Sequence, residues 1–345
     1  MTLLERTDII LMGNPHRVLC RLFIPGEEEL IRGTSRAKEL VHRCMALSEA
    51  QVEATLSRTI ERFGGRHRGL VEQFQTHASA VDSLLPESLD VSDARRKLIG
   101  AYLTQEYAFE STAYFNPSIV PHPDQSGIAD GHLRFIMSIR AVGEGHLSTL
   151  VFRTGTIRPD GQVTVDDASP WATTRATRYT ILRSRLVAQA AIEANVDTAD
   201  LEFVLGMLPD KFTPEELTAS LNQLRLVSDR MRHPEHIGDL LQELVHRSYE
   251  LDFPEDTDLT ERVFWPTAPD ERRGIEDARF VRFECDDGVT CAYRATYTAF
   301  DGMSVVSRLL ETDDFVNFSS MGLSGKAVAN KGHTWPPCGS VSMGP

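Results

Sequence analysis

The segment RRGIEDARF, Arg272 to Phe280, places two adjacent carboxylates among three arginines at the start of an apolar, strand-like run. A carboxylate that is partly withdrawn from water can hold a proton near neutral pH and act as a general acid. Adjacent residues of a strand point to opposite faces, so we expect only one of Glu276 and Asp277 to face a given site. The alternative is a surface turn in which both acids pair with the neighbouring arginines.

Polar side chains in three other segments could complete a site around such a carboxylate. Asn116 precedes Pro117, which restricts the local backbone and could leave the amide directed inward. Arg140 ends the largely apolar run FIMSI, so it requires either a buried acid or a polar ligand as its partner. Tyr297, in YRATYTAFDG, could contact a sugar, although strands commonly use these residue types for packing.

Several other kinds of chemistry lack support in the sequence. His122 and Asp124 lie close together, but their proline-rich surroundings indicate a turn, and we expect no metal site. The five cysteines are scattered without C-x-x-C spacing, which argues against a zinc site and against a disulfide framework. The chain also lacks the short motifs of acyl transfer, zinc proteolysis and nucleotide binding.

The composition and charge of the chain limit the classes of protein to which it can belong. The chain has 345 residues, of which 41% are apolar and 25% are charged, as in a globular protein of one or two domains. Its formal charge of -14 argues against nucleic acid as a partner. The start MTLLERTDII is acidic where a signal peptide is basic, and no apolar run reaches membrane-spanning length. We therefore expect a cytoplasmic protein that does not bind membranes.

Residues 1–112 are expected to form a helical module. Apolar residues recur at helical spacing from about residue 27 to residue 110, and Ser48 with Gln51 has the pattern of a capping box. Ser92 is expected to begin a further helix. Between these helices, RFGGRHRG lacks the preceding strand and the following Lys-Ser/Thr of a phosphate loop. We interpret it as a helix–helix turn with a solvated basic face.

After Tyr114 the sequence changes to β-branched and apolar segments separated by turns. FNPSIVPHPDQSG is proline-rich and turn-like, and the strands expected after it are LRFIMSIRAV, HLSTLVFRTGTI and GQVTVDD. Strand character returns in ARFVRFEC, VTCAYRATYTAF and SVVSRLLE, with Asp-Gly hairpin turns at Asp287 and Asp301.

A helical insertion at about residues 183–250 is expected to separate these two groups of strands. The run Thr213–Glu216 combines an N-cap, a proline and a capping-box Glu, which predicts a helix to about residue 230, and a second helix is expected over 234–249. The strands on both sides look like copies of one antiparallel unit, as in propeller blades, although a β-sandwich fits them too. The predicted fold class is α+β, mainly β.

Six segments together resemble glycoside hydrolase family 130, the β-mannoside phosphorylases and related β-mannosidases. They are NPSIVPHPDQSG, RFIMSIRAVGEGHLSTLVFRTG, GIEDARF, YRATYTAFDG, LLETDDFVNF and LSGKAVANKG. The likeness spans roughly Phe115 to Gly332, and the helical module is similar to an extension found in a longer branch of that family. The resemblance implies a five-bladed β-propeller, which the chain would form in part over residues 113–332.

The resemblance also implies an activity, the inverting phosphorolysis of β-mannosides, with inorganic phosphate as co-substrate and no cofactor. Asp277 would be the general acid, delivering its proton through a sugar hydroxyl. Phosphate is itself the nucleophile, so no second protein carboxylate is needed. The other roles would fall on Asn116, Arg140, Glu276 and Tyr297 as sugar contacts and on Arg279, Asn330 and Lys331 as phosphate contacts.

Two departures from the family pattern keep alternatives open. Ala329 stands where phosphate-using members often carry Arg, so an inverting β-mannoside hydrolase is one alternative. The 15 residues from Lys331 to Pro345 include three Gly and three Pro, which is not strand material, and residues 333–345 form an atypical tail. We expect a truncated or frame-shifted product. Such a chain could be an inactive sugar-binding fragment, and its open sheet edges would favour pairing with a second copy.

Overall fold

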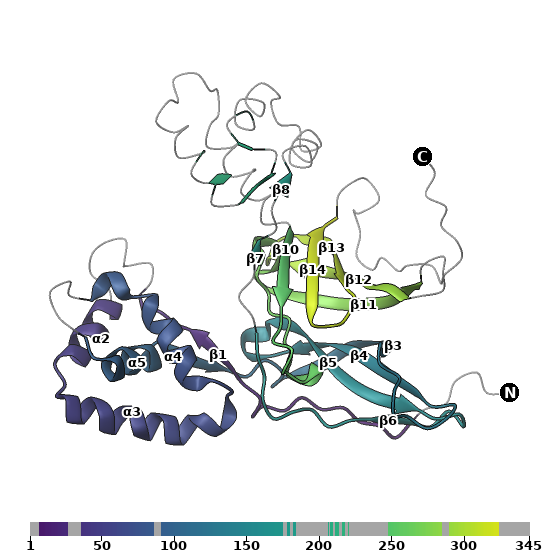
Figure 1. The fold of residues 1–345 in the computed structure, drawn as a ribbon, viewed down its shortest axis with the longest axis horizontal. Helices are drawn as coiled ribbons and strands as arrows, with labels where there is room; N and C mark the ends of the chain where they lie inside the picture. Colours follow the sequence, from purple (N-terminus) through teal and green to yellow (C-terminus); the bar gives the residue numbers. More distant parts are fainter. Residues whose placement is uncertain are drawn as a thin grey trace.

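The computed structural model describes residues 7–26, 36–85, 91–174, 248–284 and 290–323, with short pieces between 178 and 220. It has a mixed fold, mainly of strands, in which a helical module lies beside a large sheet (Figure 1). Among the described residues, no helix is both long and apolar enough to cross a membrane.

Among its described residues, the helical module contains four α-helices, each with an apolar face directed at its neighbours. They are α2 (Arg36–Met45), α3 (Glu49–Phe63), α4 (Leu70–Ser79) and α5 (Asp93–Tyr102). The predicted capping box is confirmed, because the backbone N–H of Gln51 donates to Ser48 and the backbone N–H of Ser48 donates to Gln51. The predicted helix–helix turn is also confirmed, as a short 3-10 segment at Gly64–Arg66.

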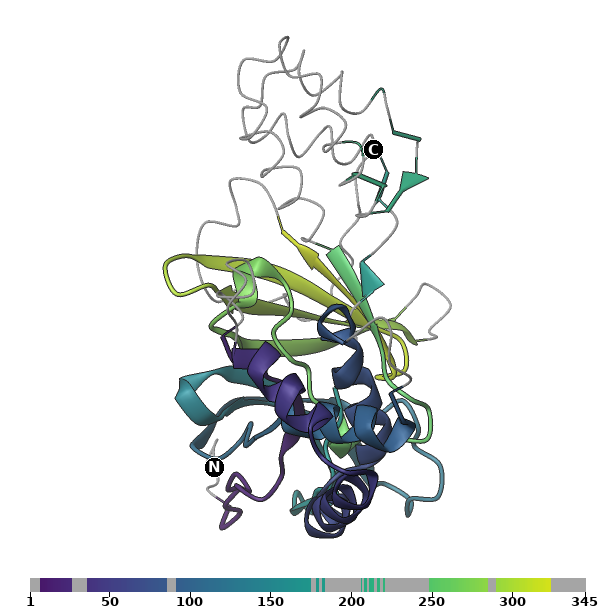
Figure 2. The same ribbon diagram turned by 90° about the vertical axis from the view of Figure 1, so that its left-hand side faces the viewer.

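The helical prediction is wrong at the end of this module. After α5 the chain forms β2 (Thr104–Tyr107), which pairs antiparallel with β1 (Leu19–Leu22). Thr104 and Tyr107 are residue types that favour strands, and pairing with a distant segment overrides helical spacing. In Figure 1, β1 lies between the helices and the β part of the molecule, and in Figure 2 the helices face the viewer.

Among the residues that the structure describes, the large sheet has ten strands in two antiparallel units. The first unit contains β3 (Ala113–Pro121), β4 (Leu133–Val142), β5 (Ser148–Ile157) and β6 (Val163–Val165). The second contains β11 (Gly274–Glu284), β12 (Thr290–Phe300), β13 (Val305–Thr312), β14 (Asn317–Gly322), β10 (Ser248–Asp252) and β7 (Arg178–Tyr179). The two units meet where Gly274 pairs in parallel with Ser148.

An aromatic core fills the space between the two units. Phe152 of the first unit packs on three aromatic residues of the second unit, Phe280, Phe315 and Phe318, with ring centroids 5.9 to 6.2 Å apart. On its other face, the first unit buries Phe135 and its neighbours against the N-terminal segment. A sheet buried on both faces needs apolar residues in succession, which explains the run FIMSI in β4.

Three expectations about the β part need correction or lie outside the described residues. The proline-rich FNPSIVP segment is strand β3, not a turn. Ser248 and Tyr249 belong to β10, so the expected helix does not extend through Tyr249. Within the insertion, the Thr213–Glu216 capping contacts are present at 2.8 and 3.2 Å, while most of residues 183–247 and the turn at Asp287 lie outside the described part.

Candidate active site

Asn116 and Asp277 form a contact between the first strands of the two units. The Asn116 amide donates from Nδ2 to Oδ1 of Asp277 over 2.5 Å. Asn116 lies in β3 and Asp277 in β11, and the two residues are 161 positions apart in sequence. Tertiary structure therefore brings together two residues that the sequence analysis selected separately.

Both residues occupy β-bulges with left-handed backbone geometry. Asn116 has φ of 47° and Asp277 has φ of 55°, at shifts in the register of β3 with β4 and of β11 with β12. Asn and Asp tolerate this region better than other side chains, and its cost is of order 1–3 kcal/mol for non-glycine residues. A bulge redirects a side chain out of the regular alternation of a strand. The two bulges therefore direct an amide and a carboxyl at each other.

The Arg140 guanidinium lies within ion-pair distance of two carboxylates, those of Glu276 and Asp277. Its Nη2 lies 2.8 Å from Oε1 of Glu276, and its Nη1 lies 3.7 Å from Oδ1 of Asp277. The expectation that strand alternation would separate Glu276 from Asp277 is therefore wrong. The bulge at Asp277 breaks the alternation, so both acids approach one guanidinium.

Ser148 and Phe115 hold the Arg140 side chain. The guanidinium donates from Nε to Oγ of Ser148 over 3.0 Å and lies 5.7 Å from the ring centroid of Phe115. Gly274 allows β11 to reach this point, because a Cβ there would lie 2.9 Å from the Ser148 backbone nitrogen. The close approach of β11 and β5 thus places the serine beside the arginine.

Buried polar groups support the two bulged strands. Ser138 of β4 donates its hydroxyl to the carbonyl of Ala278 over 3.0 Å, directly after Asp277. At the start of β3, the Tyr114 hydroxyl donates to Glu110 over 2.7 Å, and Arg17 pairs with the same carboxylate at 2.8 Å. Arg17 and Glu110 are almost fully buried, so this anchor fixes β3 two residues before Asn116.

A ligand can reach this cluster from solvent. The side chains of Arg140, Glu276 and Asp277 are 23%, 15% and 36% exposed, and Phe115 is 47% exposed. Asp277 combines one oxygen held by an amide with an accessible carboxyl group, as a proton donor or acceptor requires. The nearby guanidinium and the exposed ring are suitable for binding a polar ring such as a sugar.

Of the other predicted site residues, the two that the structure describes, Arg279 and Tyr297, do not join this cluster. Arg279 is exposed on β11, two positions beyond Asp277. Asn330 and Lys331 lie outside the described residues. Tyr297 is only 2% exposed, and its hydroxyl donates to Glu271 over 2.6 Å and lies 2.9 Å from Arg308. Burial raises the pKa of Tyr297, so its hydroxyl stays protonated and available to Glu271.

Replacing Tyr297 by Phe is expected to reduce stability without affecting ligand binding at Asp277. The change removes one hydroxyl from a buried network, which leaves polar partners unsatisfied at a cost of about 1–3 kcal/mol. Urea denaturation followed by fluorescence would measure the loss. A variant with unchanged stability but weaker binding of a β-mannoside would instead return Tyr297 to the sugar site.

Sequence reasoning missed Ser138, Ser148 and Phe115. A lone serine within FIMSI could have indicated a buried hydroxyl with a backbone partner, because such groups need a hydrogen bond. Ser148 and Phe115 carry no such signal, since their importance depends on which strands become neighbours.

No group of three or more potential metal ligands occurs among the described residues. Comparisons with protein-family models, with curated proteins and with solved structures return no match.

Proposed function

We propose that this chain is related to glycoside hydrolase family 130 and acts on β-mannosides by inverting phosphorolysis, with Asp277 as general acid. The observation that carries the proposal is the 2.5 Å contact between Asn116 and Asp277. The resemblance selects the same two residues from segments far apart in the chain, and a chance likeness gives no reason for them to meet.

The geometry at Asp277 suits proton delivery. Asn116 holds Oδ1 as an acceptor, which leaves Oδ2 to carry the proton. In the proposed reaction, that proton passes through a sugar hydroxyl to the glycosidic oxygen as the bond to the anomeric carbon breaks. Phosphate attacks the opposite face of the sugar, so the product is mannose 1-phosphate of inverted configuration.

Arg140 and Phe115 would bind the mannosyl unit that is transferred. The ion pair with Glu276 and the hydrogen bond to Ser148 fix the guanidinium, so little side-chain entropy would be lost on binding a sugar hydroxyl. The exposed face of Phe115 would provide a surface for a sugar ring.

The ion pair between Glu276 and Arg140 favours phosphorolysis over hydrolysis. An inverting hydrolase needs a second carboxylate, about 6.5–9.5 Å from the acid, to activate water. Glu276 adjoins Asp277 and is engaged by Arg140 at 2.8 Å, which suits a positioning role better than a base. Of the proposed phosphate contacts, Arg279 lies outside the Asp277 cluster, and Asn330 and Lys331 remain proposals.

The proposal extends to the architecture. The units β3–β6 and β11–β14 would be two blades of a five-bladed propeller, of which this chain would supply a part. Support comes from their shared plan: each unit begins with a bulged strand that carries a site residue, and the two pack across an aromatic core.

The proposed function can be tested by identifying the products that the purified protein forms. It would be incubated with β-linked mannose disaccharides of different linkage, with and without inorganic phosphate, and the products resolved by anion-exchange chromatography and proton NMR. Phosphate-dependent release of α-mannose 1-phosphate is the expected result. Mannose alone, in equal amounts with and without phosphate, would assign a hydrolase, and absence of any product would contradict catalysis by this chain.

A further inference from the structure

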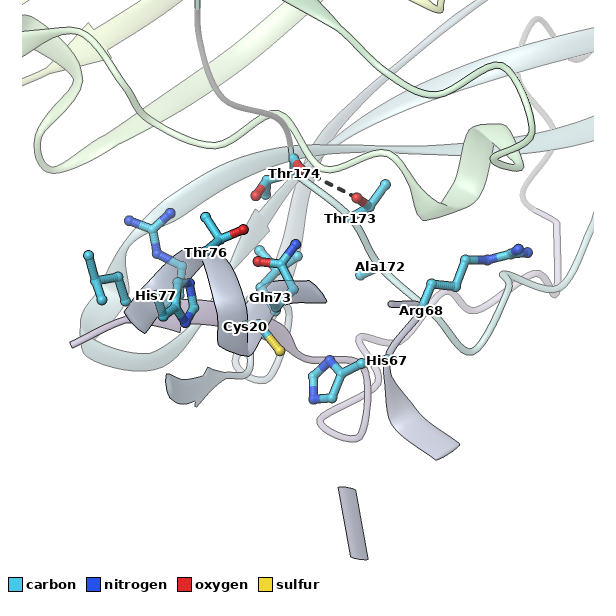
Figure 3. A pocket seen from close by; sticks show the side chains of 12 residues that line it. Cys20, His67, Arg68, Gln73, Thr76, His77, Ala172, Thr173 and Thr174 are labelled. Carbon is cyan, nitrogen blue, oxygen red and sulfur yellow. Dashed lines mark hydrogen bonds between the residues drawn. The ribbon is translucent and has the colours of Figure 1, made fainter. Parts of the chain in front are cut away.

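A cavity lies at the junction of the helical module and the β part, away from the Asp277 cluster. It has a volume of about 400 Å³ and is bounded by α4, by β1, by residues 67–68 and by residues 172–174 (Figure 3). It shares no lining residue with the Asp277 cluster. A ligand there would contact both parts of the molecule.

The charge of this cavity contrasts with that of the chain. Its lining includes two arginines and two histidines but no Asp or Glu, while the whole chain has a formal charge of -14. His67 and Arg68 already have acidic partners, since Nε2 of His67 lies 2.8 Å from Glu106 and Nε of Arg68 lies 2.8 Å from Glu261. The predicted solvated basic face is therefore present, since the Arg66 and Arg68 side chains are 40% and 43% exposed, but both arginines are also ion-paired.

Arg21 is the cation of this lining that has no counter-charge among the residues that the structure describes. Its guanidinium lies 4.0 Å from the ring centroid of Trp265, and it forms no ion pair with the described residues. Burial lowers the pKa of Arg21, although an arginine stays protonated in proteins. A half-buried cation without an anion is unfavourable, and an anionic ligand would relieve that cost.

His77 provides a hydrogen-bond acceptor in the same cavity. Its Nδ1 lies 2.7 Å from the Thr104 hydroxyl, which itself donates to the carbonyl of Gly100 over 2.8 Å. The hydroxyl proton is therefore committed, so Nδ1 must carry the imidazole proton and Nε2 is left as an acceptor. Burial, followed by the charge of Arg21, lowers the pKa of His77 and keeps it neutral at pH 7.

Gln73 adds a side-chain amide that makes no hydrogen bond with the described residues. It lies on α4, is half-buried and is labelled close to His77 in Figure 3. Cys20 also lines the cavity, but burial raises the pKa of its thiol to about 12, so we assign it no reactive role.

We propose that this cavity binds a small hydroxylated anion, a sugar-sized molecule that carries one phosphate or carboxylate group. Arg21 binds the anionic group through its planar fork of N–H donors, fixed in place by Trp265. His77 Nε2 accepts a hydrogen bond from a ligand hydroxyl, and the Gln73 amide binds the remaining hydroxyls. The volume is several times that of a phosphate ion and accommodates a hexose skeleton.

Isothermal titration calorimetry on the whole chain tests the proposal with three probes of one skeleton: glucose 6-phosphate, gluconate and glucose. We expect at least one of the two anions to bind and glucose not to bind, and the comparison identifies the anionic group. Arg21→Gln should weaken binding of that anion at least tenfold. Arg58→Gln, on the exposed face of α3, should leave it unchanged.

Gln73→Ala is a second variant, which tests the proposal even if Arg21→Gln prevents the protein from folding. Its side chain has no described hydrogen bond to lose, so we expect the fold to persist and the affinity for the anion to fall about two- to tenfold, the effect of one hydrogen bond. Failure of both anions to bind at millimolar concentration, equal binding of glucose, or full affinity in the folded Arg21→Gln variant would overturn the proposal.

Discussion

Replacing Asp277 by Asn is expected to reduce turnover of β-mannosides by about 10²- to 10⁴-fold while the fold is retained. Asn tolerates the left-handed backbone at this bulge, and its side-chain oxygen can still accept the Asn116 amide. The variant loses only the ability to carry and deliver a proton. Steady-state kinetics on a β-linked mannose disaccharide would measure the loss.

A substrate whose leaving group departs without a proton tests the role of Asp277 as general acid more directly. A dinitrophenolate departs without needing a proton, so Asp277→Asn should retain most of its activity on 2,4-dinitrophenyl β-mannoside. Asp160→Asn is the matched control, because Asp160 lies in an exposed turn and its oxygen accepts from Gln162 at 3.0 Å. An equal loss on both substrates would indicate a structural role, and full activity on both would remove Asp277 from the mechanism.

Replacing Glu271 by Ala is expected to destabilise the fold by about 3–5 kcal/mol. The Glu271 side chain is fully buried, and one of its oxygens accepts from Tyr249 at 2.8 Å and from Tyr297 at 2.6 Å. It also lies 3.3 Å from Arg308, whose side chain is fully buried. Its removal leaves the Arg308 cation short of an anion and two hydroxyls without their acceptor.

The surface pair of Arg294 and Glu311 is the control for this change. It joins neighbouring strands, and both side chains are about a third exposed. Solvent screens such a pair, so Glu311→Ala should cost no more than about 0–1 kcal/mol. Urea denaturation would compare the two variants. Equal costs would mean that the buried network is no more stabilising than a surface ion pair.

Much of the architecture could be predicted because the local signals agree with the final structure. The apolar runs of β4 and β5, the Asp301 turn and the Ser48 cap each combine a propensity with a pattern of the right period. β3 could not be predicted, because Asn116 and Pro117 normally indicate a turn. In this protein the bulge places the proline at the shift in register, where the strand continues past it.

The candidate site could be predicted as a set of residues but not as a geometry. Asn116, Arg140 and Asp277 were each identified from local sequence. Their meeting, and the sharing of Arg140 by Glu276 and Asp277, depends on two bulges that are invisible without the strand register. Tyr297 differs from these residues. The sequence analysis selected it as a possible sugar contact, but its hydroxyl lies in the buried hydrogen-bond network of Glu271.

The separation of Asn116 from Asp277 by 161 positions also bears on how the protein folds. Closing such a long loop costs chain entropy before any contact within it can compensate, and distant strand pairing is accordingly slow. Each bulge belongs to a different unit, so the amide and the carboxyl can meet only after both units have formed and docked. The contact between Asn116 and Asp277 would thus be among the last to form during refolding, later than the helices, whose caps are local.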